Sequence, residues 1–184
     1  MAGSKQTQEK LNHTLKYITV LLIQYKITNW FIGYGTLLGI IRDNACIDGD
    51  DDIDIVCDRN DFDRIHKMLK ENNINVTYDY GGIQDCRFII KTVQNDKLTS
   101  IDFYCAEIDD KGNFNDEWEK VIWTKCYTPN TPFDRYTPFL LSIKWKDIFL
   151  PIPHNCIQKL RNRYGKKWHI PQNTKGPLPR LSYL

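Results

Sequence analysis

Two short apolar segments of this 184-residue chain each carry a single aspartate near their start. They are Ile53-Asp54-Ile55-Val56-Cys57 and Ile101-Asp102-Phe103-Tyr104-Cys105. Their β-branched and aromatic residues favour strands. A carboxylate on a buried strand is costly unless it is paired with a cation or binds a metal ion. We therefore expect Asp54 and Asp102 to share one carboxylate site, with a salt bridge to a basic residue as the alternative for Asp102.

An acidic run leads directly into the first of these segments. Residues 48–54 contain five aspartates. Because strand residues two apart point to the same face, Asp50, Asp52 and Asp54 are expected to converge while the intervening isoleucines face the core. Converging carboxylates suit a hard cation such as Mg²⁺ or Mn²⁺.

The acidic run has two other possible interpretations. A solvated acidic loop is disfavoured because the acids continue into an apolar strand. A calcium-binding EF-hand that starts at Asp48 fails at two positions, since Ile53 replaces the glycine at position six and Arg59 replaces the glutamate at position twelve.

The glycines of residues 33–39 are spaced GxGxxxG, which matches neither the dinucleotide-binding fingerprint nor a Walker A loop. A Rossmann enzyme and a P-loop NTPase are therefore disfavoured. Gly35 still permits a close backbone approach, and the Thr36 hydroxyl with the amides that follow can hold a phosphate. Arg42 is expected to act as a phosphate clamp.

The hydrophobic pattern predicts a single α+β domain with a small mixed sheet flanked by helices. Apolar spacing of three and four residues predicts helices over 5–26, 58–72 and, after a tight turn at Gly35-Thr36, 37–41. Short apolar runs predict strands over 29–34, 52–57, 74–78, 87–93, 98–105 and 145–150. Asn155 and Gly165 are placed to cap a last helix, and 127–136 is expected to be loop. The expected organisation is an N-terminal helix over 1–27, a catalytic domain over 28–172 and a C-terminal coil tail over 173–184.

Composition excludes several protein classes. The chain is 41% hydrophobic and 26% charged, with a mean hydropathy of -0.50, which is typical of a folded domain. Its N-terminal apolar run, 18–23, is far shorter than the ~20 residues of a membrane span, and the polar first ten residues resemble no signal peptide. We therefore expect a cytoplasmic protein without a membrane span. None of the six cysteines forms a CxxC pair, so reduced, mostly buried thiols are expected.

The C-terminal 30 residues, 155–184, contain seven Lys or Arg and no acid. Either these cations form a solvated helix face or they hold an anionic donor or acceptor. A nucleic-acid partner is disfavoured, because no arginine-rich patch is interleaved with aromatic residues. The basic residues of the predicted helix and its end are Lys159, Arg161, Arg163, Lys166 and Lys167.

A longer pattern joins these features. Its residues are Tyr34-Gly35-Thr36-Leu37-Leu38-Gly39, Arg42, Ile47, Asp50-Asp51-Asp52-Ile53-Asp54-Ile55, Ile101-Asp102-Phe103, Leu150-Pro151-Ile152-Pro153, Leu160, Arg163-Tyr164-Gly165, Trp168 and Pro171. The pattern resembles the LicD/fukutin family of phosphotransferases, within the DNA polymerase beta-like nucleotidyltransferase superfamily. It covers roughly residues 25–172.

The resemblance implies a nucleotidyltransferase-like fold and a set of site residues. It implies that Asp52 and Asp54 are the metal pair and that Asp102 is the third ligand or the base. Gly35 and Thr36 would form the turn that binds the donor phosphate. Asp50 is expected to lie next to the metal ligands without binding the metal itself, and Arg42 is expected to neutralise phosphate charge. The Pro-Trp that usually precedes the acids is replaced by Asp48-Gly49.

The resemblance also implies a reaction, in which phosphocholine or ribitol phosphate moves from a CDP-linked alcohol donor to a glycan hydroxyl with Mg²⁺ or Mn²⁺. One alternative is a nucleotidyltransferase that transfers NMP from an NTP to a small molecule or RNA. A non-catalytic binding protein on the same fold is the other, and the intact Asp52, Asp54 and Asp102 argue against it.

Overall fold

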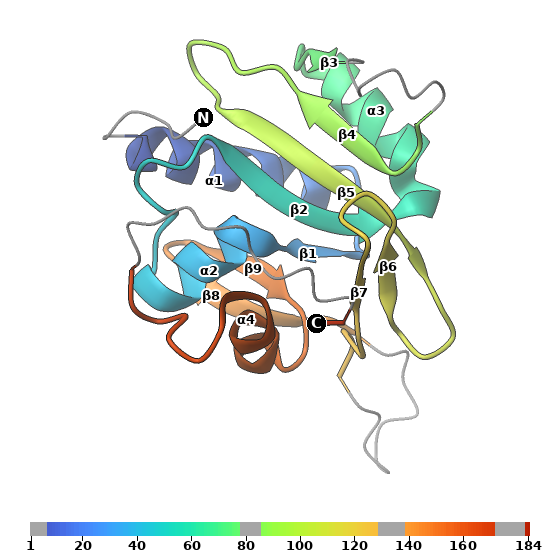
Figure 1. Cartoon of the computed structure of the whole chain (residues 1–184). Helices are drawn as coiled ribbons and strands as arrows, with labels where there is room; N and C mark the ends of the chain where they lie inside the picture. Colours follow the sequence, from blue (N-terminus) through green and yellow to red (C-terminus); the bar gives the residue numbers. More distant parts are fainter. Residues whose placement is uncertain (1–6, 78–85, 129–138, 172–182) are drawn as a thin grey trace.

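A seven-stranded mixed sheet organises the computed structural model, which describes residues 7–77, 86–128, 139–171 and 183–184 (Figure 1). The strand order is β1-β2-β5-β4-β3, and β6 pairs with both β5 and β7. Only β2 and β5 pair in parallel, and each other pair in this sheet is antiparallel. The strands are β1 (Trp30–Ile32), β2 (Asp52–Asp58), β3 (Val76–Thr77), β4 (Ile89–Thr92), β5 (Ser100–Ile108), β6 (Phe114–Asp116) and β7 (Val121–Trp123).

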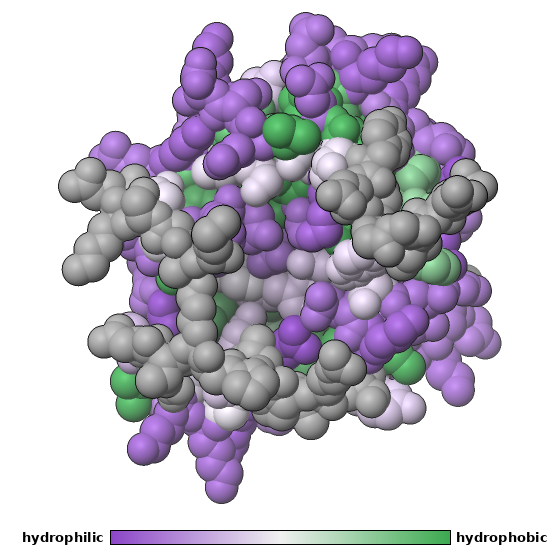
Figure 2. Space-filling model, turned by 45° about the horizontal axis from the view of Figure 1, so that its top comes forward, coloured by the Kyte–Doolittle hydropathy of each residue, from purple (hydrophilic) through white to green (hydrophobic). Residues whose placement is uncertain are grey.

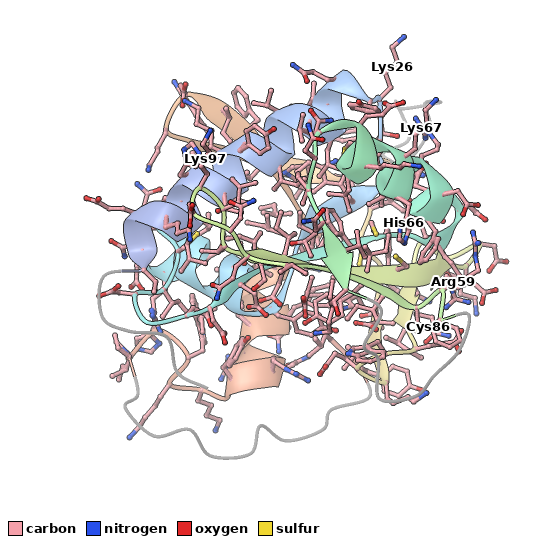
Figure 3. All side chains as sticks on the ribbon, turned by 90° about the horizontal axis from the view of Figure 1, so that it is seen from above. Lys26, Arg59, His66, Lys67, Cys86 and Lys97 are labelled. Carbon is pink, nitrogen blue, oxygen red and sulfur yellow. The ribbon has the colours of Figure 1, made fainter. Side chains whose placement is uncertain are left out.

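Helices lie on both sides of the sheet. Two of them, α1 (Gln8–Gln24) and α3 (Phe62–Glu71), lie on one side, and α3 carries the labelled His66 and Lys67 (Figure 3). On the other side, α4 (Cys156–Tyr164) lies next to α2 (Tyr34–Asp43) (Figure 1). The expected α+β fold, a mixed sheet flanked by helices, is confirmed.

The predicted N-terminal helix and the predicted helix over 58–72 are both present. In α1 the residues at the expected spacing, Leu11, Leu15, Ile18 and Leu22, are completely buried. The second begins as a 3-10 turn, η1 (Arg59–Asp61), and continues as α3. Periodicity identified both helices because one face of each meets the sheet.

The start of α2 differs from the prediction. Gly35 and Thr36 do not form a separate turn, because the helix already begins at Tyr34 with an extended Gly33 as its N-cap residue. The carbonyl of Gly33 accepts the Leu37 amide at 2.7 Å, which closes the first helical turn. The amides of Gly35 and Thr36 therefore belong to a helix N-terminus, where backbone donors have no partner within the helix.

The single strand expected at 145–150 is a hairpin of two strands, β8 (Leu141–Trp145) and β9 (Ile148–Ile152). Lys146 adopts a φ of 53° in the connecting turn. The sequence Lys-Asp does not predict this conformation, because hairpin turns with positive φ usually contain Asn-Gly or Asp-Gly. Pro151 lies within β9 opposite Ser142, which a two-stranded ribbon tolerates because each strand has an open edge. The Trp145 indole N–H fixes the hairpin by donating to the Asn44 carbonyl at 2.9 Å.

Strands β6 and β7 were not predicted, and the C-terminal residues pair with β7. Tyr183 pairs in parallel with Ile122 of β7, and Leu184 is buried. Most of the expected loop at 127–136 and of the expected coil at 173–184 lies outside the described residues. Strand β3 covers Val76 and Thr77, and the last residue of the strand predicted over 74–78 also lies outside the described residues. The proposed domain boundaries stay predictions.

All six cysteines are free thiols, and every one but Cys156 is buried. The search for a membrane-spanning helix over the described residues found none of sufficient length and apolar character.

Candidate active site

Parallel pairing of β2 with β5 places the two strand aspartates side by side. Asp54 is the register partner of Asp102, and the two residues are 6% and 4% exposed. Because alternate residues share a face, Asp52 and Tyr104 lie on this same face of the sheet. Seen from this side, hydrophilic residues occupy a hollow at the centre of the molecule (Figure 2).

Asp54 occupies the N-terminus of α2. Its Oδ2 accepts the amides of Gly35 at 2.9 Å and Thr36 at 3.3 Å, and its Oδ1 accepts the Tyr104 hydroxyl at 3.0 Å. The Asp54 amide in turn donates to the Thr36 hydroxyl at 2.9 Å. A helix N-terminus attracts an anion through its unpaired amides and its dipole. In this structure, the amides predicted to hold a donor phosphate therefore hold the Asp54 carboxylate.

Gly35 is the point where the acids approach the helix backbone. A Cβ at this position would lie 2.8 Å from the Asp50 Oδ2 and 3.2 Å from the Asp54 Oδ2. Only a residue without a side chain leaves room for both carboxylates. The close approach expected at Gly35 is thus made by carboxylates of the same chain.

Burial and mutual repulsion make these acids unusually basic. Burial, reinforced by the charges of Asp102 and Asp50, raises the pKa of Asp52 to about 7. Burial also raises the pKa of Asp54 far above its usual range, and the charge of Asp52 adds to the effect. The pKa of Asp102 is raised by burial as well, but Lys91 opposes that rise. Each of these acids therefore keeps its proton to a higher pH than a free aspartate, and a bound cation would favour its ionised form.

The three acids whose oxygens lie nearest to one another are not the predicted set of Asp52, Asp54 and Asp102. Among the described residues, Asp50, Asp51 and Asp52 form the one group of three whose ligand oxygens all lie within 4.8 Å of one another. Asp54 is hydrogen-bonded to α2, and Asp102 is ion-paired with Lys91. Hard oxygen donors with excess negative charge fit Mg²⁺ or Mn²⁺. Asp52 belongs both to this cluster and to the predicted ligand set.

Arg42, the predicted phosphate clamp, lies away from this group. It is in the last turn of α2, and its guanidinium pairs with Asp43 at 2.6 Å. Arg42 is seven residues from Gly35, which corresponds to about 10 Å along the helix axis. Within the described part of the chain its guanidinium hydrogen-bonds to Asp43 and not to the acids of β2 or β5, so its role as a clamp stays a prediction.

Lys91 is a site residue that the sequence reasoning missed. It lies on β4 opposite Asp102, forms an ion pair with that carboxylate, and has its ammonium 5.7 Å from the centre of the Trp118 ring. Lys91 is a charged residue inside the apolar segment predicted as a strand over 87–93. The same kind of signal identified the two aspartates.

An aromatic wall borders the acids at the start of α2. The rings of Tyr34 and Tyr104 are 4.6 Å apart, and the Tyr34 hydroxyl donates to the Asp116 carboxylate at 2.5 Å. The Trp123 indole N–H donates to the Tyr34 oxygen at 3.3 Å. These contacts fix Tyr34, whose φ of 39° is uncommon for a residue with a side chain.

The basic residues of α4 do not form a uniformly solvated face. Lys159 is buried and donates to the Thr124 carbonyl at 2.7 Å, and Arg163 is buried against Tyr34. Arg161 is exposed. The alternative of a purely solvated face is therefore wrong for two of the five residues.

No curated protein sequence matches the chain. Among solved structures, the lincomycin-bound lincosamide antibiotic adenylyltransferase LnuA is similar at 16% identity and a TM-score of 0.53, over 85% of this chain and 86% of that one. This likeness confirms the nucleotidyltransferase fold.

A family model agrees with the fold. The model described as LicD/FKTN/FKRP, nucleotidyltransferase domain, matches residues 27–155, which include β1 to β9 and the whole acidic face. The match supports a nucleotide-related transferase. Because it spans more than half of the chain, this protein belongs to the LicD/FKTN/FKRP family.

Proposed function

We propose that the chain is a metal-dependent phosphotransferase that moves a phospho-alcohol group, of the phosphocholine or ribitol phosphate type, from a CDP-linked donor to a glycan hydroxyl. The observation that carries the proposal is the placement of Asp54 opposite Asp102, both beside the N-terminus of α2. Family membership supports the nucleotide-linked donor.

The donor phosphate would bind at the N-terminus of α2. The amides of Gly35 and Thr36 are already arranged around one anionic group, the Asp54 carboxylate. A phosphate oxygen that takes these amides displaces Asp54 toward the neighbouring acids. Exchange of one anion for another keeps the helix N-terminus satisfied throughout.

The acids would divide the remaining work. Asp52, with Asp54 and Asp102 or with its neighbours Asp50 and Asp51, would hold Mg²⁺ or Mn²⁺. Such an ion neutralises charge on phosphate oxygens during in-line transfer. Asp102 would either be a further ligand of this ion or act as the base that takes the proton of the attacking hydroxyl.

Lys91 would assist Asp102 in either role. Its ammonium favours the ionised form of that carboxylate, which lowers a pKa that burial raises. An ionised Asp102 is required both to bind a cation and to accept a proton.

The second candidate function is transfer of NMP from an NTP to a small molecule or RNA. The likeness to an adenylyltransferase fold favours it, since both reactions use the same carboxylates. The two differ in the bond that breaks. A phosphotransferase releases CMP from a CDP-alcohol, whereas a nucleotidyltransferase releases pyrophosphate from an NTP.

Product identity therefore tests the proposal. The purified protein is incubated with Mg²⁺ or Mn²⁺ and a glycan acceptor, with CDP-choline, CDP-ribitol, CTP or ATP as donor. We expect CMP from a CDP-alcohol, with loss of the product in Asp52→Asn and normal activity in Asp96→Asn, a control at an exposed aspartate elsewhere in the fold. Pyrophosphate from an NTP, without CMP from either CDP-alcohol, would establish the second function instead.

A further inference from the structure

Arg163, near the C-terminal end of α4, is a buried cation with an unused donor. The residue is 9% exposed, and one guanidinium nitrogen donates to the Glu119 carboxylate at 3.3 Å. Among the described residues, its buried Nε has no hydrogen-bond partner. A buried donor without an acceptor is destabilising, which calls for an explanation.

The surroundings of Arg163 connect it to the acidic face. Its guanidinium lies 5.2 Å from the centre of the Tyr34 ring, and Tyr34 immediately precedes the Gly35 amide that binds Asp54. The Tyr34 ring packs 4.6 Å from Tyr104, whose hydroxyl also binds Asp54. Arg163 therefore stands beside the helix N-terminus at which the donor phosphate would bind.

Glu119 belongs to the same region. It follows Trp118, whose ring contacts the Lys91 ammonium, and its negative charge contributes to the raised pKa of Asp102. The ion pair between Arg163 and Glu119 thus joins α4 to the connection between β6 and β7 at the border of the site. Because the guanidinium still has a free Nε, Glu119 satisfies it only in part.

Resting on the function proposed above, we infer that Arg163 binds a phosphate oxygen of the nucleotide donor through Nε and a terminal nitrogen, in competition with Glu119. A guanidinium fork matches the spacing of phosphate oxygens and supplies the acceptor that Nε lacks. Arg163 lies beyond 27–155, the range of the family match, and would neutralise phosphate charge as was expected of Arg42.

Binding by calorimetry tests this without requiring turnover. CDP and ADP, each with Mg²⁺, are titrated into the wild-type protein and into Arg163→Met, Arg163→Lys and Glu119→Gln. Arg161→Met is the matched control, an exposed arginine on the same helix. We expect Arg163→Met to weaken binding at least about tenfold, as loss of a charged hydrogen bond predicts.

The conservative variants separate phosphate binding from a structural role. Arg163→Lys should recover only part of the affinity because lysine lacks the fork. Glu119→Gln should tighten binding because the competing carboxylate is removed, whereas a purely structural ion pair predicts equal or weaker binding. Arg161→Met should match wild type.

Equal affinity of Arg163→Met and wild type would overturn the inference and leave the proposed function intact. Absence of CDP and ADP binding by wild type would overturn both. If Arg163→Met fails to fold, the double variant Glu119→Gln, Arg163→Met removes both charges, and its affinity is compared with that of Glu119→Gln alone. No difference between these two would also overturn the inference.

Discussion

Replacing Asp52 with asparagine should stabilise the protein in metal-free buffer. Asp52 has a pKa near 7 in the folded state and about 4 in an unfolded chain. Between these values the folded protein holds a proton that the unfolded chain has released. Stability therefore falls as the pH rises through this window, and the full penalty is present above about pH 7.

The expected size follows from this shift. Three pKa units correspond to roughly 4 kcal/mol. Asp52 is partly exposed, and solvent screening reduces that figure, so we expect Asp52→Asn to gain about 2 kcal/mol at pH 8. For a chain of this length the gain raises Tm by roughly 4–8 °C. The gain should shrink steadily as the pH falls from 8 to 5, and it vanishes below about pH 4, where wild-type Asp52 is protonated in both states.

Thermal and denaturant unfolding with EDTA, from pH 5 to pH 8, measure this difference. Asp96→Asn removes the same formal charge from an exposed position and should leave stability nearly unchanged. Addition of Mg²⁺ should raise the Tm of wild type and reverse the order of wild type and Asp52→Asn. A variant no more stable than wild type at pH 8, or a gain independent of pH, would refute the assignment of repulsive charge to Asp52.

Two further substitutions test the geometry around the start of α2. Gly35→Ala should weaken Mn²⁺ binding about tenfold in a calorimetric titration, because its Cβ displaces the carboxylates of Asp50 and Asp54, while the far-ultraviolet circular dichroism stays unchanged; unaltered affinity would contradict this. Tyr34→Phe should lower the free energy of unfolding by about 1–3 kcal/mol in urea, because the buried Asp116 loses its hydroxyl donor; a loss near zero would show that this bond does not stabilise the fold.

Local pattern was sufficient to identify the acidic strands and the helices that pack on the sheet. Asp54 and Asp102 were both recognisable because a charge inside an apolar strand needs a partner. Their direct opposition was not, since it depends on a parallel register between segments 48 residues apart in sequence. That register is a property of the whole sheet, and short motifs do not encode it.

The missed features have specific physical causes. Strands β6 and β7 have three residues each, which is too short for alternation to be visible. The β8–β9 turn places a lysine at positive φ, where a glycine or asparagine would have been a signal. Lys91 and Arg163 are visible in the sequence as charges, but their partners, Asp102 and Glu119, are not, because each pair forms only after folding.

The aspartates between residues 48 and 58 are divided among helix N-termini and the acidic cluster. Asp48 accepts the amides of Thr7 and Gln8 at 3.0 and 3.3 Å, where α1 begins. Asp58 accepts the Asn60 amide at 2.9 Å and caps η1. These two carboxylates bind backbone amides at the starts of α1 and η1, where a negative charge is favourable.

Asp54 differs because its helix begins at the acidic face itself. It occupies the amides of α2, and it also lies close enough to Asp52 and Asp50 for their charges to raise its pKa. Neutralising the cluster would lower the cost of moving Asp54 toward it, and an incoming phosphate would replace Asp54 at the amides. The aspartates of this segment therefore cap helices and, in the function proposed above, would also bind a cation, and Asp54 takes part in both.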